Sequence, residues 1–188
     1  MRRCVKSSWM LALVLAATGC AQFKATPYSA DYEAVDRLQA SKPAKVAVAT
    51  VQPTDANASV NRLSLRGGSF VSPSGTFAKY LEDAIVRDLK EASAFDPNAG
   101  TQLSATILHN DIDITSAVTG TGDMEVRVNV TRDKAQRLDK TYKAHISFES
   151  SFAGIVAIPA GQAAYADLVR ALLRTVYADP QFTAAIAP

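Results

Sequence analysis

Three side chains that can bind metal ions alternate along one short stretch: His109, Asp111 and Asp113. On a regular β-strand, residues two apart project from the same face, so an imidazole and two carboxylates would meet there and could hold a divalent cation. The alternative is the polar side of a strand at a β-bulge, which would disturb this alignment. We favour the bulge, expect no metal site, and keep the three residues as weak metal candidates.

A second alternating stretch, His145, Ser147 and Glu149, combines the side-chain types of a serine hydrolase. Such an enzyme needs a hydroxyl, an imidazole and a carboxylate in a hydrogen-bonded row. Neighbours on one face of one strand stand about 6.5 Å apart, so these three side chains cannot easily form that row. We interpret the stretch as a solvated sheet face and rank a periplasmic hydrolase third among the functions considered.

Arg66, Gly67 and Gly68 stand a few residues before Ser72, where a helix is expected to begin. A helix N-terminus can bind an anion, but the spacing fits no phosphate loop, and a turn that needs glycine explains the pair more simply. The sequence also lacks the Cys-x-x-Cys, His-Glu-x-x-His, Gly-x-Ser-x-Gly, Walker and dinucleotide motifs. We therefore expect neither an enzyme nor a bound cofactor.

Covalent lipid attachment is the chemistry that the N-terminus predicts. Residues 1–19 have a basic start, the apolar run 9–17 and small residues up to Gly19, as in a signal peptide. Residues 15–20, which end at Cys20, resemble the bacterial lipobox. The resemblance implies cleavage between Gly19 and Cys20 and acylation of the cysteine. The alternatives are an ordinary signal with an incidental cysteine and, more weakly, an apolar anchor, which would be too short for about 30 Å of hydrocarbon.

Removal of residues 1–19 leaves a chain with 17 basic and 18 acidic side chains, because three basic residues leave with the signal. This balance and the absence of a basic cluster exclude nucleic acid as a partner. Cys4 leaves too, so an acylated Cys20 leaves no thiol for a disulfide or a metal. Ala21 after the cysteine favours, by resemblance to enterobacterial sorting, the periplasmic face of the outer membrane.

Residues 20–44 are predicted to be a tether with one short helix over 31–39, where Tyr32, Val35 and Leu38 recur at spacings of three. Fully extended, a tether of this length would reach at most about 80 Å. The alternative is that these three side chains dock on the domain and shorten the reach. Residues 45–188 are predicted to form a single periplasmic domain.

The order of elements predicts a two-layer α+β domain, with a mainly antiparallel sheet of about four strands and two amphipathic helices on one face. A strand over 46–51 is apolar on both faces, which is typical of a sheet interior. Ser72–Pro73 is expected to begin the first helix, which continues to Ser93. The second begins after Ile158–Pro159, and Asp179–Pro180 begins a short third one that carries Phe182 and Ile186.

Three strands are predicted over 102–115, 124–131 and 141–149, because apolar and polar residues alternate in them. For the two later strands to share a dry face, opposed residues must have numbers whose sum is even. The first strand changes phase, which predicts a bulge between Leu108 and Asp111. Residues 120–123 and 133–137 are expected to be the turns.

Residues 149–159 are richer in apolar side chains than an exposed loop should be. We favour a segment that crosses the domain and packs, with Phe152 and Ile155 inside. The alternative is a surface that docks a partner or an acyl chain, in which Phe152, Ile155 and Arg66 would take part.

Several stretches of the chain resemble a group of uncharacterised proteobacterial lipoproteins: the lipobox, Leu63–Gly68, Ser72–Gly75, Asn110, Glu149–Phe152 and Ala157–Pro159. In topology alone, the chain is also similar to small envelope lipoproteins of the YajG type and to auxiliary lipoproteins of transport machines. The resemblance implies a lipid-anchored, non-catalytic accessory or interaction module of envelope assembly or transport, with an envelope protein as partner. The alternative function is binding of a lipid or small ligand between sheet and helices.

Overall fold

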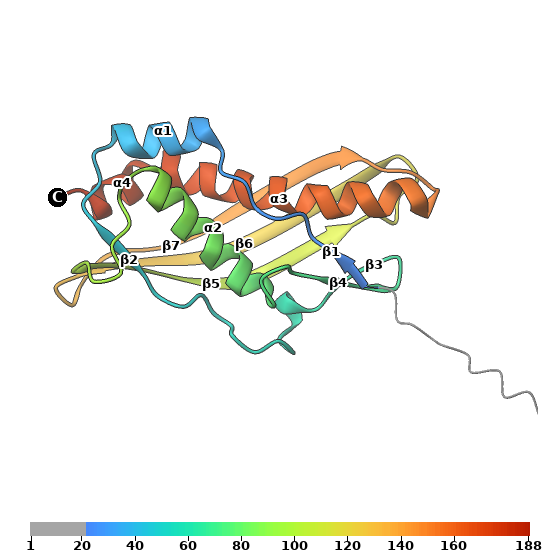
Figure 1. Ribbon diagram of the computed structural model, residues 1–188, viewed down its shortest axis with the longest axis horizontal. Coiled ribbons are helices and arrows are strands. Elements are labelled where there is room, and N and C mark those ends of the chain that lie inside the picture. The colour runs from blue at the N-terminus through green and yellow to red at the C-terminus, as the bar shows by residue number, and fades with distance from the viewer. Residues whose placement is uncertain (1–21) are drawn as a thin grey trace, which may run out of the picture.

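A four-stranded sheet in the order β2-β5-β6-β7 forms the centre of the fold (Figure 1). The structure is a computed structural model and describes residues 22–188. The strands are β2 (Val46–Val48), β5 (Thr101–Asp113), β6 (Thr119–Arg132) and β7 (Ala135–Glu149). The last three form an antiparallel meander, and β2 lies parallel to β5. The predicted α+β fold is thus confirmed, with mixed but mostly antiparallel sheets.

The alternation of apolar residues sets the register of the meander. Asp123 lies opposite His145 and Met124 opposite Ala144, so from Thr119 to Val130 the numbers of paired residues have even sums, as predicted; the register shifts after Val130, next to the turn. The register of β5 against β6 shifts between Ile107 and His109, one residue from the expected interval. Leu108 is the extra residue, and the shift keeps both Ile107 and Ile112 on the buried face.

Four helices accompany the sheets: α1 (Tyr32–Ala40), α2 (Phe77–Glu91), α3 (Gly154–Ala178) and α4 (Pro180–Ile186). Helices α2 and α3 cover the apolar face of the meander. Four aromatic rings connect these two helices to a second, three-stranded sheet, and neighbouring ring centroids are 4.6–5.7 Å apart. The rings belong to Phe70, Phe77, Tyr80 and Tyr165. Asp179 caps α4, and Phe182 and Ile186 are buried, as predicted.

A second sheet, in the order β1-β4-β3, was not predicted as such. It contains β1 (Gln22–Lys24), β4 (Gly68–Val71) and β3 (Leu63–Leu65), which follows a single turn of 3-10 helix, η1 (Ser59–Asn61). Only the stretch around Leu63 and Leu65 had the pattern of a short strand. Strand β1 pairs in parallel with β4, and β3 pairs with β4 as a hairpin.

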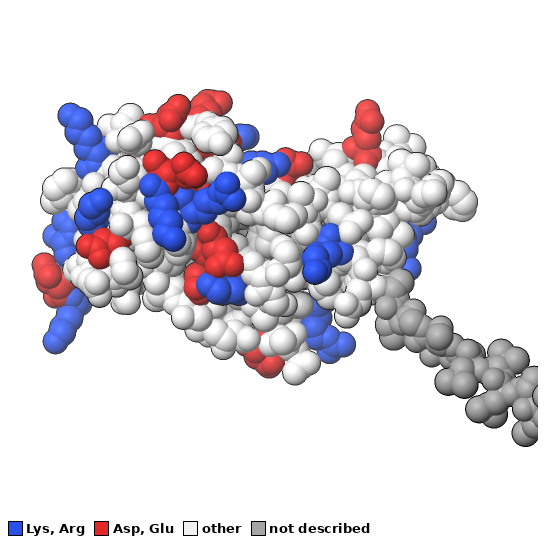
Figure 2. All heavy atoms as spheres, in the orientation of Figure 1, with Lys and Arg blue, Asp and Glu red and all other residues white. Residues whose placement is uncertain are grey.

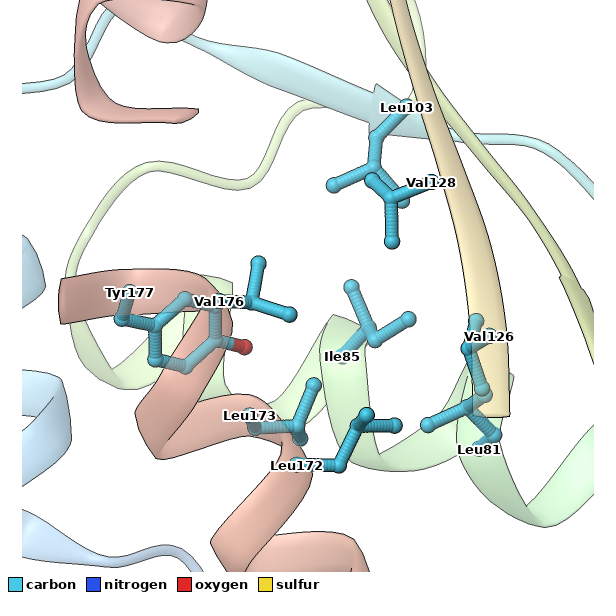
Figure 3. Close-up of a pocket in the computed structure, with 9 residues that line it drawn as sticks. All are labelled: Leu81, Ile85, Leu103, Val126, Val128, Leu172, Leu173, Val176 and Tyr177. Atoms are coloured by element: carbon cyan, nitrogen blue, oxygen red, sulfur yellow. The ribbon is translucent and has the colours of Figure 1, made fainter. Parts of the chain in front are cut away.

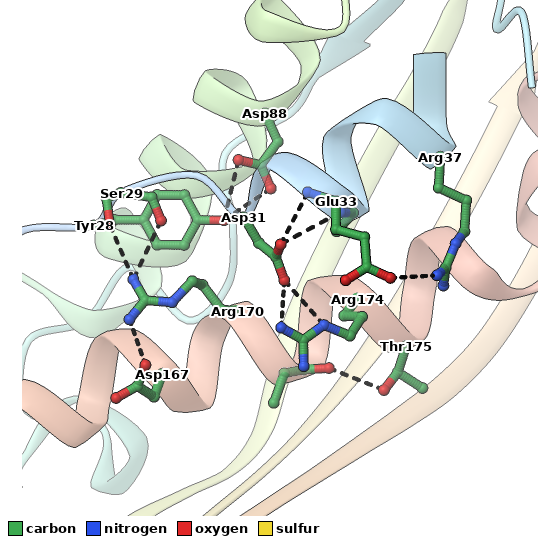
Figure 4. A network of polar contacts seen from close by, with 12 residues as sticks. Tyr28, Ser29, Asp31, Glu33, Arg37, Asp88, Asp167, Arg170, Arg174 and Thr175 are labelled. Carbon is green, nitrogen blue, oxygen red and sulfur yellow. Dashed lines mark hydrogen bonds and ion pairs between the residues drawn. The ribbon is translucent and has the colours of Figure 1, made fainter. Parts of the chain in front are cut away.

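Residues 22–41, which we call the N-terminal strap, lie across the helices instead of forming a free tether (Figure 4). The hydroxyl of Tyr28 donates to the carboxylate of Asp88 on α2, and Asp31, the N-cap of α1, pairs with Arg174 on α3. Val35 and Leu38 are buried, whereas Tyr32 is 72% exposed. Of the two alternatives for this helix, docking is the one observed, and Tyr32 takes no part in it.

Two expectations about the strands were wrong. Strand β2 is at the edge of its sheet, and its apolar character is explained by a covering segment: Val46 donates to Ala94 and accepts from Asp96. Residues 120–123 lie within β6, and the connection runs over 114–118. Gly120 and Gly122 are needed for packing, because a Cβ on Gly120 would stand 2.4 Å from the ring of Phe148. The other turn falls within its predicted range but is shorter: it consists of Asp133 and Lys134, both at positive φ, and residues 135–137 already belong to β7.

The predicted starts of two helices were also wrong. Helix α2 begins after Thr76, which caps it by accepting from the N–H of Lys79 at 3.0 Å. Ser72 cannot be its N-cap because Gly75 has a φ of +95°, which is incompatible with a helix. Helix α3 begins at Gly154 and contains Pro159. A proline in the second turn removes one helical hydrogen bond, to the carbonyl of Ile155, and Pro159 is itself exposed.

Candidate functional site

Four large apolar side chains gather on the surface where α3 begins. Their exposed fractions are 73% for Val118, 81% for Phe152, 86% for Ile155 and 54% for Val156. We call these four residues the apolar tip. The loop before β6 and the loop after β7 meet there, because the N–H of Ser150 donates to the carbonyl of Val118 at 2.8 Å. The favoured expectation that Phe152 and Ile155 pack inside the domain is therefore wrong.

The local sequence explains why these side chains stay outside. Ser151 Oγ accepts from the N–H of Ala153 at 3.1 Å and turns the chain into α3. The first turn of the helix then carries Ile155 and Val156 outward, while Ala157 is fully buried. Residues 150–166 contain no charged side chain. Among residues 22–188, the tip holds four of the six exposed large apolar side chains, so this is a patch and not the usual scatter.

The tip is tied to the place where the described chain enters the fold. Arg66, in the turn between β3 and β4, donates from Nη2 to the carbonyl of Ser151 at 2.9 Å. Gln22, the first residue of β1, lies opposite Ser69, just after that turn. Figure 1 shows β1, the β3–β4 hairpin and the start of α3 in one half of the molecule. Arg66 thus lies beside the tip, as the docking alternative required.

Charge is distributed unevenly along the long axis of the molecule. On the face shown in Figure 2, lysine, arginine and acidic side chains crowd the end that holds α1 and α4, and the end at which α3 begins is mostly uncharged. Along α3 itself, the charges begin only at Asp167, which pairs with Arg170. The two ends of one helix therefore offer different surfaces, one apolar and one polar.

The polar face of the meander brings together a carboxylate, an imidazole and a hydroxyl. His145 Nδ1 lies 2.9 Å from Asp123 Oδ1, and His145 Nε2 lies 3.4 Å from Ser147 Oγ. The acid is Asp123 on β6 and not Glu149, which the sequence suggested. Asp123 and His145 line an open hollow of about 400 Å³, and Ser147 is not part of its lining. The backbone N–H groups of β6 are used in the sheet, so they supply no pair of donors for an oxyanion.

His109, Asp111 and Asp113 share the exposed face of β5 after the bulge, but they have other neighbours. His109 lies opposite Glu125, and Asp111 opposite Asp123. The side chain and N–H of Thr115 bind the carboxylate of Asp113 and lower its pKa. Within residues 22–188, no three His, Cys, Asp or Glu side chains are grouped closely enough to hold a metal ion.

The space between the sheet and the helices is filled by side chains. Figure 3 shows a cavity there of about 10 Å³, lined almost entirely by apolar side chains. Its walls come from α2, α3 and the strands: Leu81, Ile85, Leu103, Val126, Val128, Leu172, Leu173, Val176 and Tyr177. A volume of this size holds at most about one water molecule. This cavity therefore has no room for a lipid.

Sequence reasoning found Phe152, Ile155 and Arg66 but missed Val118, Val156 and Asp123. The signal for the tip was the long uncharged stretch 150–166, which includes the first half of α3. Asp123 was assigned to a turn, and its place beside His145 follows only from the strand pairing. Cys20 and Gly19 lie outside the described residues.

No family model and no curated protein matches the sequence. Solved structures do match in fold. A protein from Xanthomonas campestris of the family DUF330 has a TM-score of 0.60 at 11% identity, over 87% of this chain and 96% of its own. A hypothetical protein from Chlamydia trachomatis has a TM-score of 0.50 at 14% identity, over 76% and 99%. A candidate lipoprotein from Caulobacter crescentus has a TM-score of 0.42 at 13% identity, over 81% and 93%.

The first two likenesses show a shared fold and nothing finer, because both identities are below 15%. The third match is too weak to carry an argument. Among the helices of residues 22–188, none is both long and apolar enough to cross a membrane.

Proposed function

We propose that this chain is a lipid-anchored, non-catalytic protein of the periplasmic face of the outer membrane, acylated at Cys20. In this role it is an accessory or interaction module in envelope assembly or transport, and its partners are the membrane and an envelope protein. One observation carries the proposal: the fold begins two residues after the lipobox-like cysteine, at a strand tied through Arg66 to an exposed apolar surface.

The polar face of the meander is the surface best suited to an envelope protein. It is long, because β6 has 14 residues and β7 has 15, and no helix within residues 22–188 covers it. Its ion pairs include Arg127 with Asp139 and Lys143 with Glu125. Exposed charge pairs contribute little to stability, whereas charged groups at an interface select partners and orient them.

The anchor is tested by the mass and the fractionation of the mature protein. We expect a species that begins at Cys20 and carries acyl chains, and a Cys20→Ala variant that is uncleaved or released from membranes. A Cys20→Ala variant that is still processed and still sediments with membranes would contradict the lipoprotein assignment.

The partner is tested by photo-cross-linking in membranes from two single positions. A cross-linking side chain at Thr141, on the exposed face of β7, should trap a discrete envelope protein. The same side chain at Tyr32, which is exposed on α1, serves as the control. Equal capture from both positions, or capture from Tyr32 alone, would contradict the assignment of the polar face.

A hydrolase is the second candidate, and the row Asp123–His145–Ser147 is the observation that favours it. The exposure of these side chains argues against a hydrolase: His145 and Asp123 are 58% and 47% exposed to solvent. A nucleophile on an open sheet face lacks the water-excluded setting in which electrostatic stabilisation of a transition state is strong. A covalent fluorophosphonate probe distinguishes the two functions by whether Ser147 reacts.

A further inference from the structure

We propose that the apolar tip is seated in the interface of the same membrane that holds the lipid anchor, so that the domain has a fixed orientation. The inference rests on the proposed acylation of Cys20 and goes beyond it. An anchor alone would let the domain take any orientation, whereas a seated tip defines one end that contacts lipid and one that faces away.

Chain connectivity supports this placement. Gln22 is already paired with Ser69 in the second sheet, and only two peptide steps separate it from Cys20. Each step spans at most about 3.8 Å between Cα atoms, so an acylated Cys20 holds the β3–β4 turn within a short distance of the lipid headgroups. Because Arg66 in that turn binds the carbonyl of Ser151, the residue next to Phe152, the tip is held near the same surface.

The chemistry of the tip fits a bilayer interface. Peripheral segments bind there by burying aromatic and aliphatic side chains among the headgroups and the upper acyl chains. Phe152, Ile155 and Val156 project from the first turn of a helix and the residues before it, and Val118 extends the patch from the neighbouring loop. Arg66 beside them is a cation that suits lipid phosphate.

The acidic groups near this end are on another face. Asp113 and Glu149 lie on the polar face of the meander, in phase with Asp123 and His145. Asp113 is close enough to Arg66 for this cation to contribute to the lowered pKa of its carboxyl, so the charge of this carboxylate is partly offset where it approaches the tip. A membrane accounts better than a protein for a patch that stands beside the anchor, because the anchor keeps lipid next to it at all times.

The test uses the emission of a single tryptophan. The only tryptophan of the chain is Trp9, which lies in the predicted signal and is lost on processing. Phe152→Trp therefore places one reporter at the tip, and Tyr32→Trp places a matched one on α1. Both original side chains are aromatic and mostly exposed, so both variants should fold. Asp31, next to Tyr32, pairs with Arg174, which is about 28 Å along α3 from Ile155.

Each full-length variant is expressed with its signal, purified and reconstituted into phosphatidylethanolamine–phosphatidylglycerol vesicles, with and without brominated acyl chains. We expect the emission of the Phe152→Trp reporter to shift to shorter wavelength and to lose most of its intensity in brominated vesicles. The Tyr32→Trp reporter should do neither. Adding Ile155→Ser and Val118→Ser to the tip reporter should restore most of the lost intensity.

Equal quenching at the two positions, or a tip reporter that stays unquenched, overturns the proposal. The emission of the Phe152→Trp reporter could also shift to shorter wavelength without being quenched, and shift further at higher protein density. That result indicates that a second copy or another protein covers the tip, and it also overturns the proposal. Mass spectrometry of Cys20 separates these outcomes from failure of the anchor. If Cys20 proves not to be acylated, the function proposed above fails. The membrane contact of the tip then stands only if added brominated vesicles still quench the emission of the Phe152→Trp reporter.

Discussion

Asp88 is a carboxylate that the fold buries without a positive partner, and we expect it to make the stability of the protein fall as pH rises. It is 1% exposed, within α2. Its oxygens lie 2.8 and 3.0 Å from the hydroxyl of Tyr28 in the N-terminal strap. Burial raises the pKa of this carboxyl to about 6, although the hydrogen bond from Tyr28 opposes the rise.

The direction and size of the effect follow from the two pKa values. In the unfolded chain the carboxyl loses its proton near pH 3.8, whereas in the folded protein it keeps the proton until about pH 6. Between these values the folded state binds more protons at this site, so the contribution of Asp88 to stability is greatest below pH 3.8 and declines until the pH passes about 6. The difference between the pKa values corresponds to about 3 kcal/mol of unfolding free energy.

Asp88→Asn isolates this contribution because the amide keeps an acceptor for Tyr28 and cannot ionise. Urea denaturation at pH 4 and at pH 7 gives the unfolding free energy of both proteins. Because the unfolded carboxyl is already partly ionised at pH 4, the variant should gain about 2 kcal/mol over the wild type between the two conditions. The carboxyls of Asp31, Asp113 and Asp179 have lowered pKa values, so their contributions change below this window.

The matched control is Asp36→Asn, on the exposed face of α1, which should follow the wild type. Parallel pH profiles for the wild type and Asp88→Asn would refute the reasoning. So would a variant that loses stability relative to the wild type as the pH rises.

Three further outcomes are expected. Phe152→Ser with Ile155→Ser should change the unfolding free energy by less than about 0.5 kcal/mol per site, and a much lower melting temperature would show that these side chains pack. Leu38→Ala should cost about 2–5 kcal/mol in denaturant titrations, whereas Tyr32→Ala should cost almost nothing; equal effects would contradict the docking of α1. A fluorophosphonate probe should leave Ser147 unmodified by mass spectrometry, and labelling that Ser147→Ala abolishes would establish the hydrolase instead.

The meander could be predicted because the alternation of apolar and polar residues within each strand largely determines it. Alternating apolar residues determine which face of a strand is dry, and one buried face restricts the register of its neighbours. The phase change of β5 similarly required one extra residue, and Leu108 is that residue. The pairing of Asp123 with His145 followed the same parity rule, but the sequence could not supply the absolute register that brings these two side chains together.

The sequence-based predictions were wrong where a strand is formed or covered by residues that are distant in the sequence. An apolar strand such as β2 can lie at a sheet edge when a segment 48 residues away supplies a backbone partner: Val46 bonds to Ala94. The three residues of β1 form a strand only because β4 is beside them. The apolar stretch before Pro159 was assigned to the interior because burial is the usual fate of such residues. Its exposure is therefore the informative observation.

Docking of the N-terminal strap changes how far the domain can act from the membrane. A free tether would have reached about 80 Å, but lengthening the link beyond Gln22 would require β1 to leave β4 and Tyr28 to leave Asp88. The reach is then set by the folded body, in which α3 extends about 37 Å from the tip to its charged end. A partner of the polar face must accordingly approach the membrane to within about the length of this helix.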